Sequence, residues 1–213
     1  GPFDDQIGFI RTDNSGKIYI AGYASEGFPV TQGAYQTVFS GNYDAFVSVL
    51  SPDIDSLLYS TYIGGPSTER GISIVLDNSK NIYFLIWITG DFPTTTGAYD
   101  NTYNGGNDIA VCKFNPTLSS LLYSTIIGGP SNDIGLSYLF LDADNNAIFS
   151  GQAGSGFPTT VGSYDQTYNG GSTDGTLDII MSYPHLKILH QIEQLGMYQA
   201  IDLGFRSANG EYI

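Results

Sequence analysis

The chain has 213 residues, of which 41% are apolar, so it can bury a substantial core. Its 21 acidic and 7 basic residues give a net charge of −14, which disfavours nucleic acid and anionic membranes as partners. No apolar run approaches the roughly 20 residues of a membrane helix, and the single Cys112 excludes an intrachain disulfide. With 27 Gly, 16 Tyr and 12 Phe, the composition favours short strands joined by tight turns, and we predict an all-β fold.

Four phrases recur along the chain in a fixed order, with a period of 64 or 65 residues. In the first unit they read DNSGKIYIAG from Asp13, GFPVTQGAY from Gly27, GNYDAFVSVLSP from Gly41 and SLLYSTYIGGP from Ser56. The second unit repeats all four, and its last phrase reads SLLYSTIIGGP from Ser120. A third unit repeats the first two phrases, as DADNNAIFSG and GFPTTVGSY. This pattern predicts an internal structural repeat.

Each unit is predicted to contain four strands, which in the second unit cover 71–77, 81–88, 109–114 and 121–127. A tight hairpin at DNSGK or DNSKN joins the first two strands, a long loop joins the next two, and NPTLSS makes the last turn. One such antiparallel sheet cannot bury both faces, so copies must stack. We therefore predict a β-propeller with four antiparallel strands in each blade, incomplete or open in this chain.

The predicted boundaries follow the repeat. We expect a first blade over 1–64, a second over 65–128, a third over 129–198 and the start of a fourth over 199–213. The third blade diverges over 176–198, where its outer strands should lie. There DIIMSY and LKILHQIEQLG suggest a degenerate strand pair, and a short helix over 186–195 is the alternative, since Leu186, Leu189, Ile192 and Leu195 have helical spacing. About three blades cannot close alone, so we expect further blades from a longer chain or another subunit.

The ordered phrases resemble the SBBP repeat, a family of predicted β-propeller repeats in secreted and surface proteins of bacteria. The resemblance covers residues 1 to about 175. It implies a propeller blade and a secreted or cell-surface location, and it brings no catalytic residues with it.

Several polar residues are of the types found in metal-binding or catalytic sites, but their positions are better explained by turn formation. Asp44, Asp108 and Asp174 open the third strand of each unit, where a carboxylate accepts hydrogen bonds from loop amides. The segment DADNN from Asp142 resembles the start of a calcium loop but lacks the later glycine and glutamate, so we predict a hairpin. His185 and His190 have no partners at metal-ligand spacing. No metal, cofactor or catalytic residue is therefore predicted.

Aromatic residues recur at two positions of the long loop. Phe28, Phe92 and Phe157, with Tyr35, Tyr99 and Tyr164, are predicted to pack in the core or between blades; their positions recur because every blade faces the same kind of neighbour. The loop residues Tyr103, Asn104, Tyr168 and Asn169 are the candidates for contact with a ligand.

These observations predict a non-catalytic binding or adhesion scaffold that contacts a protein or glycan through its loop rim. The alternatives are an assembly component of a larger surface complex or filament, and a fragment of a polysaccharide-acting enzyme. Binding requires exposed loop side chains on one rim, assembly requires surfaces buried against another chain, and an enzyme requires carboxylates that converge in a central pocket.

Overall fold

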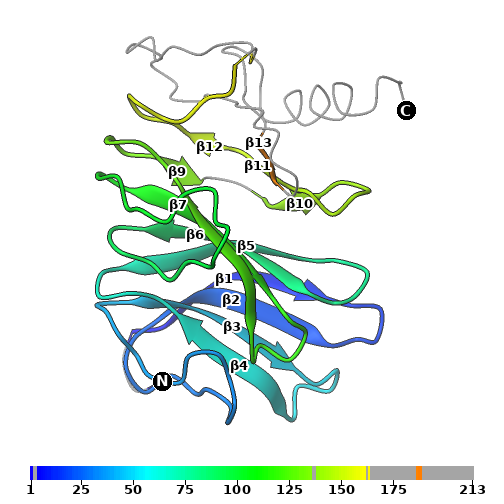
Figure 1. Cartoon of the computed structure of the whole chain (residues 1–213). Coiled ribbons are helices and arrows are strands. Elements are labelled where there is room, and N and C mark those ends of the chain that lie inside the picture. Colours follow the sequence, from blue (N-terminus) through cyan, green and yellow to red (C-terminus); the bar gives the residue numbers. More distant parts are fainter. Residues whose placement is uncertain (2–3, 136–137, 162, 164–185, 189–213) are drawn as a thin grey trace.

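The structure is a computed structural model that describes residues 1, 4–135, 138–161, 163 and 186–188, and every structural statement below refers to them. Within these residues the regular elements are all strands, so the all-β prediction is confirmed. Sheets of antiparallel strands stack one above the other along the molecule, from the N-terminal sheet to the yellow-green segments (Figure 1). The arrangement is that of blades in an open or incomplete propeller.

Two of the sheets are complete four-stranded meanders in which each strand pairs with the next along the chain. The first sheet consists of β1 (Gln6–Thr12), β2 (Ile18–Ala24), β3 (Asp44–Leu50) and β4 (Leu57–Ile63). The second consists of β5 (Glu69–Leu76), β6 (Ile82–Ile88), β7 (Asp108–Phe114) and β8 (Leu121–Ile127). The predicted strands of the second unit agree with these bounds to within two residues.

The third unit is built from shorter strands in two small sheets. Its strands are β9 (Ile134–Gly135), β10 (Phe140–Leu141), β11 (Ala147–Phe149), β12 (Gly151–Gln152) and β13 (Leu186–Ile188). The antiparallel pairs β9–β12 and β10–β11 correspond to the first two strands of the other sheets. β13 lies in the segment for which strand and helix were both open; it is a strand there, but it pairs parallel with β11. The predicted strand at 178–183 and the predicted start of a fourth blade lie outside the described residues.

The hairpin turns form as predicted, and one aspartate organises each of them. The Asp13 carboxylate accepts hydrogen bonds from the Ser15 and Lys17 amides at 2.8 and 3.1 Å. The backbone at the fourth turn position has a positive φ, which Gly16 supplies in the first turn. Lys80 and Asn145 adopt the same left-handed conformation in the other two turns, with φ of 64° and 63°.

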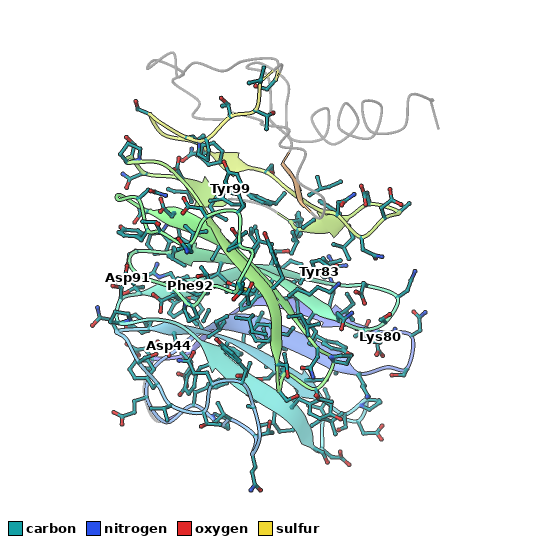
Figure 2. The ribbon with its side chains drawn as sticks, viewed as in Figure 1. Asp44, Lys80, Tyr83, Asp91, Phe92 and Tyr99 are labelled. Atoms are coloured by element: carbon teal, nitrogen blue, oxygen red, sulfur yellow. The ribbon has the colours of Figure 1, made fainter. Side chains whose placement is uncertain are left out.

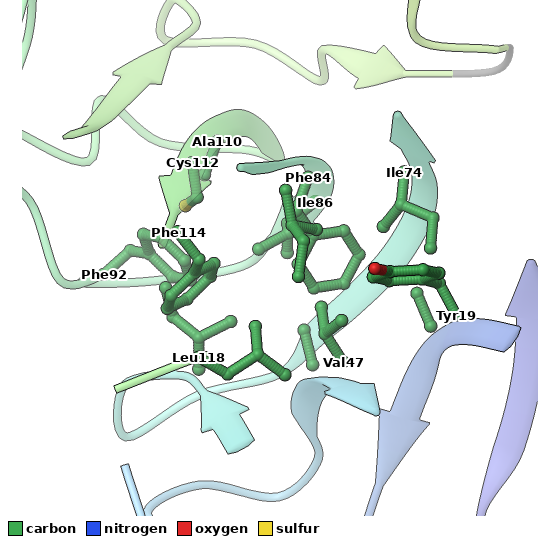
Figure 3. Close-up of a cluster of buried hydrophobic side chains, with 14 of the residues drawn as sticks. Tyr19, Val47, Ile74, Phe84, Ile86, Phe92, Ala110, Cys112, Phe114 and Leu118 are labelled. Atoms are coloured by element: carbon green, nitrogen blue, oxygen red, sulfur yellow. The ribbon is translucent and has the colours of Figure 1, made fainter. Parts of the chain in front are cut away.

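Neighbouring sheets pack through the same pair of faces. Between the first and second sheets, the face of the first sheet that carries Tyr19, Ala21 and Val47 lies against the face of the second sheet that carries Ile74 and Phe84 (Figure 3). Between the second and third units, the corresponding residues Tyr83, Leu85 and Val111 meet Leu139, Ala147 and Phe149. The predicted stacking is thus a head-to-tail repetition of one interface, and it forms the main core.

The recurring phenylalanines belong to this packing. The Phe28 ring lies on Phe46 with centroids 4.1 Å apart, Phe92 is buried in the cluster between the first and second sheets, and Phe157 packs against the cluster on the other side of the second sheet. Tyr35 reaches from the loop of the first sheet to the second, where its ring meets Phe114 at 5.7 Å. The prediction of core and inter-sheet packing is confirmed for these residues; Tyr164 lies outside the described part.

Candidate functional site

Both long loops emerge at the same end of the stacked sheets, which we call the loop rim. It consists of the β2–β3 loop at 25–43, the β6–β7 loop at 89–107, and the strand ends next to them. Asp44, Asp91 and Phe92 lie towards this end in Figure 2, while Lys80, on a hairpin turn, lies at the opposite end. The residues that were predicted from the sequence to contact a ligand belong to the long loops, and therefore to this rim.

Each loop folds back along the outer strand of its own sheet. In the first sheet the Thr31 amide donates to the Ser60 carbonyl at 3.0 Å, and the Ser60 amide donates to the Thr31 hydroxyl at 3.0 Å. Thr95 and Ser124 make the same two contacts in the second sheet, at 3.2 and 3.0 Å. The loops therefore satisfy backbone groups along the open edges of β4 and β8 and are themselves held in place.

A buried aspartate at the start of the third strand fixes the far end of each loop, as predicted. Asp44 is fully buried and accepts hydrogen bonds from the Ser40 and Gly41 amides at 3.0 and 3.1 Å and from the Gln36 side chain at 2.9 Å. Asp108 accepts from the Asn104 amide at 2.9 Å. Asp174, the third member of this set, lies outside the described residues.

A second carboxyl group lies beside Asp44 at the junction between the first two sheets. Glu69 is fully buried and accepts a hydrogen bond from the Gly65 amide through Oε2 at 3.0 Å, while its Oε1 has no partner among the described atoms. A Cβ at Gly64 would lie 2.5 Å from Glu69 Oε2 and 2.7 Å from Asp44 Oδ1, so glycine is required there. Burial and the charge of Asp44 raise the pKa of Glu69 to about 8, despite the Gly65 hydrogen bond.

The next junction repeats this carboxyl pair with Asp108 and Asp133. Asp133 accepts hydrogen bonds from the Gly129 and Gly154 amides at 2.7 and 2.6 Å. Burial raises the pKa of Asp108 to about 6 against the opposing effect of the Asn104 amide, and the charge of Asp133 raises it further. The repeated GGP turn thus encloses one buried carboxyl pair at each junction. The second member of each pair was not predictable from the sequence, because Glu69 and Asp133 differ in residue type.

The candidate ligand residues of the second loop have contacts within the protein. Tyr103 is partly buried against the inter-sheet core, and its hydroxyl donates to the Gly106 carbonyl. Asn104 is exposed, and its side-chain amide donates to Asp100 at 2.8 Å and to the Thr102 carbonyl at 3.1 Å. Both residues order the loop, and a role in ligand contact stays a prediction. Tyr168 and Asn169 lie outside the described residues.

Sequence reasoning missed a cluster of aromatic rings around Arg70 at the loop rim. The Arg70 guanidinium lies 5.0 Å from the centre of the Tyr23 ring and 5.3 Å from that of Trp87, and Tyr43 meets Tyr23 edge-on at 5.2 Å. Arg70 and Trp87 are cross-strand partners on β5 and β6, whereas Tyr23 comes from β2 of the first sheet. Tyr23 and Trp87 are aromatic residues at the same position of two successive repeats. This recurrence is the sequence feature from which the cluster could have been predicted.

The opposite end of the molecule has a cavity of about 310 Å³, lined by Arg11, Asp77, Asp142 and neighbouring residues. Its two carboxylates are engaged in their hairpin turns. Asp77 accepts from the Asn81 side chain at 2.8 Å and lies 3.2 Å from the Lys113 ammonium group. Asp142 accepts from the Asn146 amide at 2.8 Å. These contacts support the hairpin reading of DADNN, and within the described part no three His, Cys, Asp or Glu residues form a metal-binding group.

Cys112 packs as a small core residue, as expected. It is fully buried, and its Sγ lies 3.3 Å from the Ser124 hydroxyl oxygen. Burial raises the pKa of its thiol to about 12, so the reactive thiolate is suppressed at neutral pH. His185 and His190 lie outside the described residues.

Comparison with known families matches residues 168–213 to glycosyl transferase family 2. This match covers less than a quarter of the chain and falls on the segment where the repeat pattern breaks down, nearly all of it outside the described residues. No curated protein matches the chain.

The family resemblance inferred from the repeated phrases is wrong, because the family comparison returns glycosyl transferase family 2 and not the SBBP repeat. The phrases do encode stacked four-stranded sheets, but the same turn and packing requirements can produce such phrases without membership of that family. The predicted secreted or cell-surface location loses the support it drew from the resemblance. No helix in the described part is long and apolar enough to cross a membrane.

Proposed function

We propose that the chain is a non-catalytic scaffold that binds a protein or glycan partner at its loop rim. The observation that carries this proposal is the cluster of Tyr23, Arg70 and Trp87. Its rings and guanidinium come from two sheets and lie next to loops that are anchored by hydrogen bonds to buried carboxylates. Such an arrangement offers a pre-organised surface, which limits the entropy lost on binding.

The chemistry of the cluster suits polar partners with apolar faces. Aromatic faces pack against sugar rings and apolar side chains, and Tyr, Trp and Arg are enriched among the residues that dominate protein interfaces. Among the described residues, the Arg70 guanidinium has no ion pair or side-chain hydrogen bond, and Arg70 is exposed. Its donors are therefore available to a carboxylate or hydroxyl group of a partner.

Trp87 makes the proposal directly testable, because it is the only tryptophan in the chain. Ligands found on a glycan array, or a captured protein partner, should change its fluorescence on titration. We expect Arg70→Ala and Tyr23→Ala to weaken binding by about tenfold or more, typical of central interface residues. Lys80→Ala, at the opposite end of the molecule, is the control and should bind as the unaltered protein does.

The proposal fails if ligands bind without changing Trp87 fluorescence, or if Arg70→Ala and Lys80→Ala bind equally well. A retained far-UV circular dichroism spectrum shows that each variant is folded.

A further inference from the structure

Oxygen atoms gather around two glycines at the junction between the first and second sheets. A Cβ on Gly64 would lie 2.5 Å from Glu69 Oε2 and 2.7 Å from Asp44 Oδ1. A Cβ on Gly41 would lie 3.2 Å from Asp44 Oδ1 and would also contact the Ser67 carbonyl oxygen. The groups that meet here, which we call the first oxygen cluster, are the carboxyl groups of Asp44 and Glu69 and the carbonyl groups of Gly65 and Ser67.

The first oxygen cluster has more hydrogen-bond acceptors than the nearby donors satisfy. Glu69 Oε1 is fully buried and has no partner among the described residues. Neither Asp44 nor Glu69 forms an ion pair with any described Lys, Arg or His side chain. A buried oxygen atom of this kind is commonly satisfied by a bound water molecule or ion.

The junction between the second sheet and the third unit repeats the arrangement. Its carboxyl pair is Asp108 and Asp133, and Asp108 Oδ1 is again fully buried without a partner in the described part of the chain. Gly128 leaves room for the Asp108 carboxyl group, and Gly106 leaves room for the Ser131 carbonyl oxygen. We call these groups the second oxygen cluster. An unsatisfied buried carboxyl oxygen therefore occurs at both junctions, although the two pairs differ in residue type.

We propose that each oxygen cluster binds one calcium ion between its two carboxyl groups. Calcium accepts carboxylate and backbone carbonyl oxygens as ligands in an irregular geometry, and water molecules complete its shell. Both clusters offer such oxygen ligands, and two carboxylates match the double charge of the ion. Neither cluster contains the His or Cys ligands that zinc and copper prefer. This inference does not depend on the binding function proposed above.

In the metal-free protein a proton takes the place of the ion at the first cluster. Burial and the charge of Asp44 raise the pKa of Glu69 to about 8, so Glu69 keeps its proton at neutral pH. Calcium competes with this proton, because a carboxyl group must be ionised to bind a metal. The bound ion joins the start of β3 to the GGP turn and to β5, and so stabilises the junction beside the loop rim.

The proposal is tested by the Tm of the full chain in calcium and in a chelator. Differential scanning calorimetry is performed above pH 8, where the proton on Glu69 competes least. Calcium at about a hundred times its Kd should raise the Tm by about 5 °C or more. Magnesium at the same concentration should raise it much less, because magnesium requires a near-ideal octahedral set of ligands.

The variant Glu69→Gln tests the first cluster without disturbing the fold. Its amide has the shape and charge of the protonated carboxyl group, and circular dichroism in the chelator should match that of the unaltered protein. The variant should lose about half of the calcium-induced rise in Tm, and calorimetric titration should show that it binds one ion fewer. Asp108→Asn tests the second cluster in the same way. Asp53→Asn is the matched control, because Asp53 is exposed in the β3–β4 turn and its loss changes the net charge equally.

Four results would overturn the proposal. The Tm could be the same in calcium and in the chelator, or magnesium could raise it as much as calcium does. Glu69→Gln could keep the full calcium effect, which would leave only a proton at the first cluster. Asp53→Asn could lose as much of the effect as Glu69→Gln, which would mean that calcium acts on the net charge alone.

Discussion

Individual carboxyl groups have a structural role at the junctions between sheets. Asp44 and Asp108 accept hydrogen bonds from loop amides, a role that their position before the third strand made predictable. Glu69 was not predictable in this way, because its position carries Asp133 in the next unit and the residues before it are turn residues. Its burial follows only from the contact between two sheets.

Glu69 should make stability depend on pH. Its pKa is about 8 in the folded protein, against a usual value of 4.5, because it is buried beside Asp44. Between these values the folded state holds a proton that the unfolded state releases, so this contribution is complete below pH 4.5 and is lost as pH rises through 8. In calcium-free buffer, we expect the Tm to fall by about 3 °C or more between pH 5 and pH 8.5.

The variant Glu69→Gln isolates this effect, since the amide has a similar shape and does not titrate. Its Tm should vary less over the same pH range than that of the unaltered protein, measured by differential scanning calorimetry. Equal slopes in the two proteins would show that Glu69 ionises normally. Asp108, whose pKa is raised to about 6, contributes in the same direction in both proteins and cancels in the comparison.

Among the elements, each long loop covers the open edge of the outer strand of its own sheet, as an additional strand would. The loop phrases ending in GAY and the outer-strand phrases beginning LLYST recur together because they are bonded to each other. Thr31 binds Ser60, and Thr95 binds Ser124. The sequence predicted the strands, whose apolar runs and turn residues are local signals. It could not predict that the loop pairs with the outer strand. Thr31 and Ser60 are 29 residues apart, and neither phrase indicates which segment it binds.

Removing the Thr95 hydroxyl should loosen the outer strand of the second sheet. The hydroxyl accepts from the Ser124 amide at 3.0 Å and donates to the Ser124 carbonyl at 3.3 Å. Thr95→Val keeps the shape of the side chain but leaves the Ser124 amide without this partner, at a cost of about 1–2 kcal/mol in the free energy of unfolding. Urea unfolding measures the loss, and hydrogen exchange should be faster at the Ser124 amide.

Thr96→Val is the matched control for this experiment, because Thr96 is exposed on the same loop. It should change the free energy of unfolding by less than about 0.5 kcal/mol, as surface substitutions usually do. If both variants lost the same stability, the loop would not be anchored through Thr95.

At the scale of the whole molecule, the first and second sheets share one core and should unfold together. Phe84 of the second sheet is fully buried between them, in the cluster that includes Tyr19 and Val47 of the first sheet (Figure 3). Phe84→Ala should lower the free energy of unfolding by about 3–5 kcal/mol, because it removes the ring and leaves a cavity. Chemical denaturation followed by circular dichroism measures this loss.

Cooperative unfolding of the sheets is measured by comparing two spectroscopic signals. Trp87 fluorescence reports on the second sheet, whereas the far-UV circular dichroism signal reports on all of them. The two signals should give one coincident transition in the unaltered protein and in Phe84→Ala. Separate transitions would mean that each sheet is an independent folding unit.

The sequence by itself determined the strands, the turns and the need for stacking, because apolar alternation, turn residues and a 64-residue period are local or repeated signals. The tertiary structure alone decided which side chains gather at the loop rim and which of the equivalent apolar residues are buried. Tyr23 meets Arg70, and Leu118 is buried whereas Ile54 is exposed, only through the placement of one sheet on another. Equivalent positions in a repeat have the same chemistry, but their exposure depends on the neighbour that each sheet has.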